Sequence, residues 1–297
     1  MGNKTHKAGF VNIIGKPNVG KSTLMNALIG ENLSIITSKA QTTRHRIMGI
    51  VNGDDFQIVY SDTPGILQPG YKLQEYMLKF ARSAISDADI ILFVTEPEEN
   101  TGELGDLLGK LQKLKVPVLL LINKIDLSTS EQVDELINEW QSALPAAKVI
   151  PISALEKFNL EKVFELILEN LPDSPPYYPK DELTDKSERF FVSEMIREKI
   201  LLHYKQEVPY SVEVVVESFK ESEKIIHISS LIYVERDSQK GILIGHQGKG
   251  LKKVGMESRI DMEKFFGKKV FLETRVKVKK DWRNDGRFLK QSGYNPT

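Results

Sequence analysis

Residues 15–22 have the spacing of a phosphate-binding loop. They read GKPNVGKS, which matches G-x-x-x-x-G-K-[ST] between an apolar run and a helix-like segment. Glycine lets backbone N–H groups crowd round phosphate oxygens, lysine supplies a point charge for the β- and γ-phosphates, and a hydroxyl binds magnesium. The sequence therefore predicts a nucleoside triphosphate site whose phosphate-binding residues are Gly15, Asn18, Val19, Gly20, Lys21, Ser22 and Thr23.

A second set of residues is typical of magnesium binding and phosphate sensing. The run DTPG at 62–65 follows an apolar stretch, so that Asp62 can reach magnesium through a water while the Gly65 N–H faces a γ-phosphate. Thr43, in the polar segment upstream, is expected to bind magnesium, with Thr42 in reserve. We predict Lys21, Thr43 and Gly65 as catalytic residues and Ser22, Thr43 and Asp62 as metal ligands.

Position 66 argues against fast hydrolysis. Nucleotide switches of the Ras type place a water-orienting Gln there, whereas this sequence has Ile66, whose side chain cannot orient water. Arg44, His45 and Arg46 are nearby candidates for stabilising charge. A solvated loop face is the interpretation that we favour for these three residues.

Two further motifs indicate which base is bound. Asn123-Lys124-Ile125-Asp126 follows an apolar run, and the Asp126 carboxylate can accept both donors on the guanine edge, which adenine lacks. Ser153, Ala154 and Leu155 follow the next apolar run and can offer backbone N–H groups to guanine O6. With Gly15, Asn18–Thr23, Asp62 and Gly65, the residues Asn123, Lys124, Asp126, Ser153, Ala154 and Leu155 complete the predicted GTP site.

The elements that must position these motifs alternate along the chain. Apolar runs at 10–15, 56–62, 89–95, 116–123 and 148–153 favour parallel strands buried on both faces. Between them, the segments 22–30, 71–85, 102–114, 130–144 and 159–171 have apolar residues at helical spacing. We predict a mostly parallel α/β sheet with helices on both faces, and its ligand edge lies at the carboxyl ends of the strands.

The pattern changes after a proline-rich segment. The predicted division is a nucleotide-binding domain over 1–172, a linker over 173–187 and a second domain over 188–297. In the second domain we expect a helix at 189–204, strands at 210–219 and 224–236, a glycine-rich turn, a helix at 249–266 and a strand at 270–278. This order predicts a smaller α+β domain with an antiparallel component.

The charge of the chain is concentrated at its end. Residues 1–172, 173–238 and 239–297 have net formal charges of −4, −5 and +9, which cancel over the 297 residues. Within the basic segment, GHQG at 245–248 is a G-x-x-G turn followed by lysines, and such a turn lets a nucleic-acid backbone approach closely. The predicted RNA-binding residues are Gly245, His246, Gln247, Gly248, Lys249, Lys252 and Lys253.

Composition excludes several classes of site. The chain has no Cys, so thiol nucleophiles, disulfides and Cys-ligated metal centres are excluded, which suits a reducing cytosol. No run reaches 18 apolar residues, which disfavours a membrane span, and the start MGNKTHKAG has no apolar stretch before the first predicted strand, which disfavours a signal peptide.

Taken together, these motifs resemble the Era family of bacterial ribosome-assembly GTPases. The GKPNVGKS, QTTRHR, DTPG, NKID and SAL segments and the IGHQG turn span nearly the whole chain. The resemblance implies a Ras-like P-loop GTPase fold followed by a type II KH fold, with Mg²⁺ as cofactor. It also implies binding of GTP and GDP, and of small-subunit (16S) ribosomal RNA near its 3′ end in the 30S subunit. Ile66 matches the family, whose members lack the catalytic Gln, and Asn18 matches an Asn that holds K⁺ in related GTPases.

We therefore expect a slow GTP-hydrolysing switch whose γ-phosphate orders residues 34–46 and 65–80 and thereby controls RNA docking. We expect a monomer in the cytoplasm with peripheral association at the inner face of the membrane. Two alternatives remain: a GTPase whose second domain binds protein, which salt-dependent RNA binding would separate, and an ATP-dependent kinase. The kinase alternative leaves the NKID and SAL motifs without a task, and nucleotide competition tests it.

Overall fold

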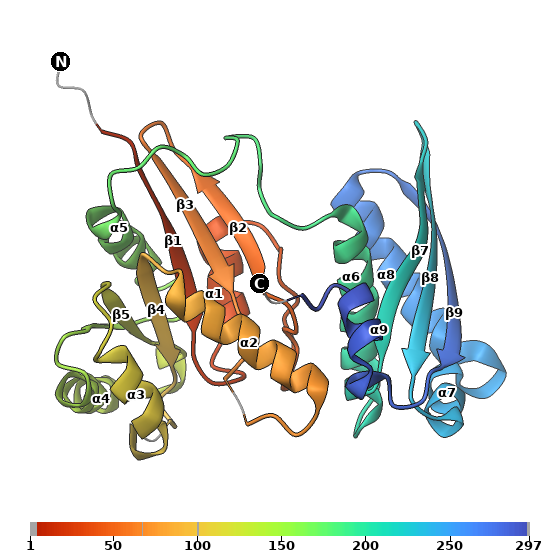
Figure 1. The fold of residues 1–297 in the computed structure, drawn as a ribbon, viewed down its shortest axis with the longest axis horizontal. Coiled ribbons are helices and arrows are strands. Elements are labelled where there is room, and N and C mark those ends of the chain that lie inside the picture. The colour runs from red at the N-terminus through yellow and green to blue at the C-terminus, as the bar shows by residue number, and fades with distance from the viewer. Residues whose placement is uncertain (1–4, 67, 100, 296–297) are drawn as a thin grey trace.

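The computed structural model describes residues 5–66, 68–99 and 101–295, which form two layered units (Figure 1). In the first, the described strands follow the order β2-β3-β1-β4-β5-β6, in which β2 is antiparallel to β3 and the other neighbours are parallel. Their bounds are β1 (Lys7–Ile14), β2 (Ile47–Asn52), β3 (Phe56–Asp62), β4 (Ile90–Thr95), β5 (Val118–Ile122) and β6 (Lys148–Pro151).

Helices cover both faces of this sheet. The side chains of β1 alternate between the two faces, so that they pack against helices on either side. Val11 and Ile13 pack with α1 (Lys21–Ile29) and α5 (Leu160–Asn170). Ile14 packs with α3 (Gly105–Leu111) and α4 (Ser130–Ala143), and Asn12 donates to the Ala84 carbonyl of α2 (Lys72–Ser86) at 2.5 Å. Short 3₁₀ turns η1 (Thr101–Leu104) and η2 (Ile125–Leu127) precede α3 and α4. Each P-loop or base motif thus leaves the sheet at the carboxyl end of a parallel strand.

The second unit has helices against a sheet of order β7-β8-β9, in which β7 and β8 are antiparallel and β8 and β9 are parallel. Buried Ile196 of α6 and Met262 of α8 belong to one core with Ile228 of β8. In chain order the elements are α6 (Glu188–His203), η3 (Val208–Tyr210), β7 (Glu213–Glu221), β8 (Ile225–Val234), α7 (Asp237–Ile244), η4 (His246–Gly248), α8 (Lys249–Phe266), β9 (Lys269–Val278), η5 (Trp282–Asn284) and α9 (Gly286–Gln291). The predicted fold class, α/β followed by α+β, is confirmed.

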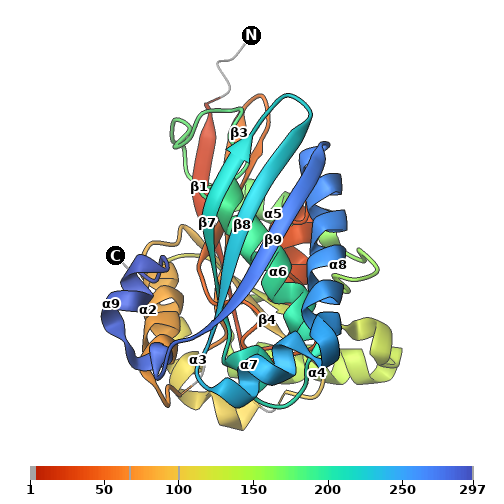
Figure 2. The same cartoon turned by 90° about the vertical axis from the view of Figure 1, so that its right-hand side faces the viewer.

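Two segments connect the units. Residues 173–187 run along β2, where Ile50 N–H donates to the Leu183 carbonyl at 2.8 Å and the Thr184 hydroxyl donates to the Met48 carbonyl at 2.7 Å. At the other end of the chain, η5 and α9 pack on α2, with which α9 lies side by side (Figure 2). Both connections bring the second unit close to the segment between α1 and β2.

Some elements differ from the sequence prediction. Strand β2 was not predicted, because six residues with a central glycine have little pattern of their own and are completed by pairing with β3. Residues 237–244 form α7 rather than part of a turn, since the Gln239 side-chain oxygen accepts from the N–H groups of Glu235 and Arg236 at 3.0 and 3.1 Å. The helix predicted over 102–114 is the shorter α3, and η5 and α9 were not anticipated.

Candidate functional site

The P-loop connects β1 to α1 and encloses one side of a pocket. Gly20 has φ of 96°, and a Cβ there would lie 2.2 Å from the side-chain nitrogen of Asn123, so only glycine fits. The pocket has a volume of about 260 Å³ and is lined by Asn18, Gly20, Lys21, Ser22, Thr23, Thr43 and Gly65 among others. The structure therefore brings the predicted phosphate and switch residues together.

Lys21 is the buried cation of this pocket. Its ammonium donates to the carbonyl oxygens of Gly15 at 3.1 Å and Lys16 at 2.6 Å. Burial lowers the pKa of Lys21 to about 8, against the raising effect of Asp62 and two glutamates. The side chain is thus held at the phosphate loop by neutral acceptors, and an anionic phosphate would offer a stronger partner.

The three predicted metal ligands meet beside the P-loop. The Ser22 hydroxyl donates to Asp62 Oδ2 at 2.6 Å, and Thr43 Oγ1 lies 2.9 Å from Ser22 Oγ and 3.3 Å from Asp62 Oδ2. Burial raises the pKa of Asp62, opposed by the bond from Ser22 and the charge of Lys21. Asp62 Oδ1 is buried with no hydrogen-bond partner among the described residues. Two hydroxyls and a carboxylate oxygen without a partner fit Mg²⁺, which prefers oxygen ligands.

The DTPG segment passes close to the P-loop. A Cβ on Gly65 would lie 2.6 Å from the ring of Pro17, so a side chain at this position would push the two loops apart. Ile66 donates its N–H to the Gly15 carbonyl at 3.4 Å, and its aliphatic side chain cannot orient water. Leu67, within the predicted switch 65–80, lies outside the described residues.

The base motifs lie on the loops after β5 and β6. Asn123 donates to the Val19 carbonyl at 2.8 Å and accepts from the Ala154 N–H at 2.9 Å, so that one side chain holds three loops together. The Asp126 side chain is exposed and forms no hydrogen bond or ion pair with the described residues. Its carboxylate is therefore available to an external donor pair.

The other base residues are unequal. Lys124, with φ of 63°, forms an ion pair with Glu96. Ser153 and Ala154 are buried, whereas the Leu155 side chain is 72% exposed, which leaves its backbone as its contribution to a base site. Sequence reasoning missed the Asn123 bridge and Glu96, because neither loop contact has a sequence pattern.

The interpretation of Arg44, His45 and Arg46 as a solvated loop face is wrong, since all three are buried. Arg44 Nη1 donates to the Val212 carbonyl at 2.7 Å and pairs with Glu213 at 3.2 Å in the second unit. Arg46 pairs with Asp87 at 2.5 Å. These partners direct both guanidinium groups away from the phosphate pocket.

His45 is also unsuited to stabilising phosphate charge. Its ring stacks on Tyr294 with centroids 4.2 Å apart and meets Phe190 edge-on at 5.4 Å. Burial lowers the pKa of His45 to about 3, so that the imidazole is neutral at physiological pH. The three residues instead tie the segment between α1 and β2 to its surroundings.

The predicted RNA-binding residues lie away from the phosphate pocket, at a turn between two helices and on the start of the second helix. Gly245–Gly248 joins α7 to α8, and His246 and Gln247 are exposed. Lys249, Lys252 and Lys253 are exposed on the first turns of α8. There, Lys253 Nζ lies 3.9 Å from Glu257 Oε1. The turn is thus open to a ligand and adjacent to positive charge.

A groove of about 410 Å³ begins at this turn and continues between α8 and β9. It is lined by Gly248, Leu251, Lys252, Gly255, Met256, Arg259, Leu272 and Thr274. An apolar floor with cations at its side suits bases and phosphates of a single strand. Of the groove residues, only Gly248 and Lys252 were among the predicted RNA-binding residues, although Met256 and Arg259 follow Lys252 at helical spacing.

Comparison with known proteins finds matches for both parts of the chain. Residues 10–124 match the family model of the 50S ribosome-binding GTPase, and residues 207–283 match that of the KH domain. The chain is similar to the protein in a crystal structure of Era in complex with MgGDPNP and nucleotides 1506–1542 of 16S ribosomal RNA. It has 37% identity to that protein, covering 97% of this chain and 99% of the other with a TM-score of 0.92. A variant of Aquifex aeolicus Era bound to GDP.AlF4⁻ matches with the same identity, coverage and TM-score.

Proposed function

This chain belongs to the Era family of GTPases, and we propose that it is a nucleotide-dependent switch which binds small-subunit ribosomal RNA near its 3′ end and acts in assembly of the 30S subunit. One observation carries the proposal: a guanine-nucleotide site and a KH groove occur in one chain that aligns over 97% of its length with a relative holding both ligands. The family that residues 10–124 match is named after the 50S subunit, but this match covers the GTPase part of the chain alone.

Within this proposal the residues of the pocket divide the work of GTP hydrolysis. Lys21 neutralises the β- and γ-phosphates, and the backbone N–H groups of Gly15, Asn18–Thr23 and Gly65 bind their oxygens. Ser22, Thr43 and Asp62 would hold Mg²⁺, which stabilises charge on the transferred phosphoryl group when bound. Asp126 selects guanine. Since Ile66 leaves the attacking water without a side-chain partner at this position, turnover is slow.

We also propose that Asn18 holds K⁺ beside the phosphates. Asn18 has φ of 67° and lines the phosphate pocket, where its side-chain oxygen can reach a monovalent cation. Replacing potassium with sodium in the assay should therefore lower the GTPase rate without changing GDP affinity, because the cation acts on the charge of the transition state. Equal rates in the two salts at matched ionic strength would remove K⁺ from the mechanism.

The family relationship further supports a monomer in the cytoplasm, with peripheral association at the inner face of the membrane. Sedimentation of the purified chain with and without anionic vesicles tests the monomeric state and the membrane association. Over the residues that the structure describes, no helix is long and apolar enough to cross a bilayer.

The switch itself predicts coupling between the two ligands. RNA carrying the small-subunit 3′ end should bind the protein about 5- to 150-fold more tightly with a GTP analogue than with GDP, the usual range of allosteric coupling. The same factor must appear in reverse, as tighter binding of the analogue when RNA is present. Titrations in both orders measure it, and crosslinking in cells with sequencing of the attached RNA identifies the target. Equal RNA affinity in both nucleotide states would contradict a switch.

A further inference from the structure

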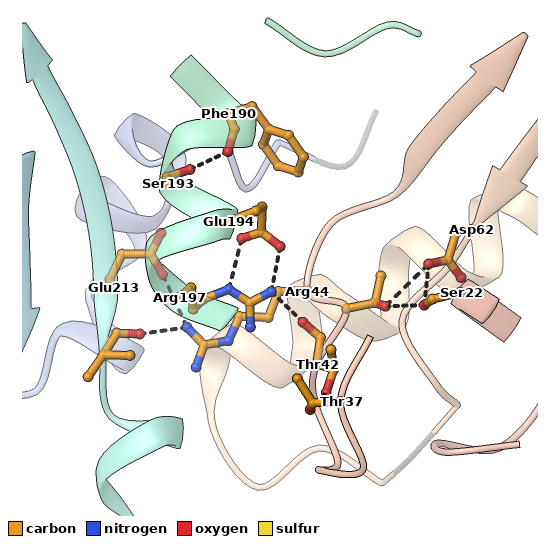
Figure 3. A network of polar contacts seen from close by, with 12 residues as sticks. Ser22, Thr37, Thr42, Arg44, Asp62, Phe190, Ser193, Glu194, Arg197 and Glu213 are labelled. Carbon is orange, nitrogen blue, oxygen red and sulfur yellow. Dashed lines mark hydrogen bonds and ion pairs between the residues drawn. The ribbon is translucent and has the colours of Figure 1, made fainter. Parts of the chain in front are cut away.

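Arg197, on α6 of the second unit, reaches the switch segment of the first. Arg197 is 2% exposed, and its guanidinium donates to both Glu194 carboxylate oxygens, from Nε at 2.8 Å and from Nη2 at 2.5 Å. Nη2 of Arg197, which donates to one of these oxygens, also donates to the main-chain carbonyl of Thr42, a residue 155 positions earlier in the chain (Figure 3). Although burial opposes ionisation, Arg197 keeps the pKa of Glu194 below its usual value, so that the pair stays charged.

The carbonyl that Arg197 holds belongs to the peptide unit joining Thr42 to Thr43. This unit is planar, so fixing its oxygen also restrains the N–H and Cα of Thr43. Thr43 Oγ1 in turn lies 2.9 Å from Ser22 Oγ and 3.3 Å from Asp62 Oδ2. A single peptide unit therefore separates a cation of the second unit from the proposed metal ligands.

The other side of Thr43 is anchored to the same unit. Arg44 donates to the Val212 carbonyl at 2.7 Å and to Glu213 at 3.2 Å (Figure 3). Thr43 is thus flanked by two contacts to the second unit, one through the backbone before it and one through the side chain after it. The position of its hydroxyl depends on how the two units are docked.

We propose that Arg197 is a positioning residue for GTP hydrolysis, which holds Thr43 in place from the RNA-binding unit. The inference rests on the role proposed above for Thr43. Movement of α6 on RNA docking would act directly on the Thr42 carbonyl and so on the Thr43 hydroxyl. In a single-domain switch the γ-phosphate alone orders this segment, whereas here the RNA-binding unit also helps to hold the segment that contains Thr43.

The test removes the Thr42 contact without leaving a buried charge. Because Glu194 and Arg197 are both buried, single substitutions strand one charge, whereas an apolar replacement of both is often neutral for folding. The variant is therefore Glu194→Leu with Arg197→Met. Lys199→Met is the matched control, because Lys199 lies on the same helix and pairs with Glu198 and Asp261 of the second unit instead of the switch. Circular dichroism and Tm establish folding.

The expected result has two parts. The kcat of GTP hydrolysis should fall about tenfold in the double variant, equivalent to about 1.4 kcal/mol of lost transition-state stabilisation, with GDP affinity unchanged. Amide hydrogen exchange of residues 42–44 in the nucleotide-free protein should rise by about the same factor, as expected when a charged hydrogen bond is lost. Lys199→Met should resemble the wild type in both measurements.

Unchanged kcat and unchanged exchange in the folded double variant would overturn the inference. If the double variant does not fold, Arg197→Lys replaces it, because lysine keeps the charge beside Glu194 but lacks the planar fork, and the same two measurements decide. Thr43→Ala separates this inference from the proposed function. Hydrolysis unaffected by Thr43→Ala would refute the role of Thr43 as a ligand, whereas the exchange measurement still reports whether Arg197 holds the switch.

Discussion

Asp126→Asn should weaken GTP binding by about 2–4 kcal/mol, because an amide presents a donor where guanine also presents donors. The structure makes this substitution clean. The Asp126 side chain is exposed and has no hydrogen bond or ion pair with the described residues, so its replacement disturbs no internal side-chain bond. Asn123, which does hold three loops together, is left in place.

The same variant should gain relative preference for xanthosine triphosphate, whose carbonyl matches the new amide donor. Competition titrations of GTP, ATP and xanthosine triphosphate against wild type and variant measure the change. Asp134→Asn, an exposed carboxylate on α4, controls for loss of surface charge. Wild-type protein that binds ATP as well as GTP, or a variant with full GTP affinity, would show that the base pocket is assigned wrongly.

Replacing His246 and Gln247 together with Asp should weaken RNA binding by about 100-fold or more. The two carboxylates would stand where the RNA backbone passes the G-x-x-G turn, and like charges at such an interface are strongly unfavourable. Both side chains are exposed, and Gln247 has φ of 52°, a conformation that Asp tolerates better than most residues. Folding and GTP affinity should therefore be retained.

Neutral replacement of the same two residues by Asn provides the control, because it changes shape and hydrogen bonding similarly without adding charge. Affinity for single-stranded RNA is measured across a salt series for both variants, together with GTP affinity. Lys252→Ala should lower the salt slope by up to about 0.7, the share of one counterion per single-strand phosphate. Intact RNA binding by the folded double-Asp variant would move the RNA site away from this turn and favour a protein-binding second domain.

Much of the nucleotide site could be predicted because its motifs are short and each follows a strand. GKPNVGKS, DTPG, NKID and SAL occupy loops whose positions are set once β1, β3, β5 and β6 form one sheet. The helix α7 could not be predicted as readily. Its sequence DSQKGILI contains a glycine and ends in an apolar run, and the Gln239 contacts that begin the helix are apparent only in the structure.

The sequence by itself determined the chemistry of the phosphate and base loops, because consecutive residues carry that information and the parallel sheet places the loops at one edge. Tertiary structure alone decided the roles of Arg44, His45 and Arg197. Their partners Val212, Tyr294 and Thr42 are 155 to 249 positions away and belong to the other unit. The sequence around a buried arginine of this kind does not differ from that around a solvated one, because the arginine becomes buried only when two separately packed cores dock.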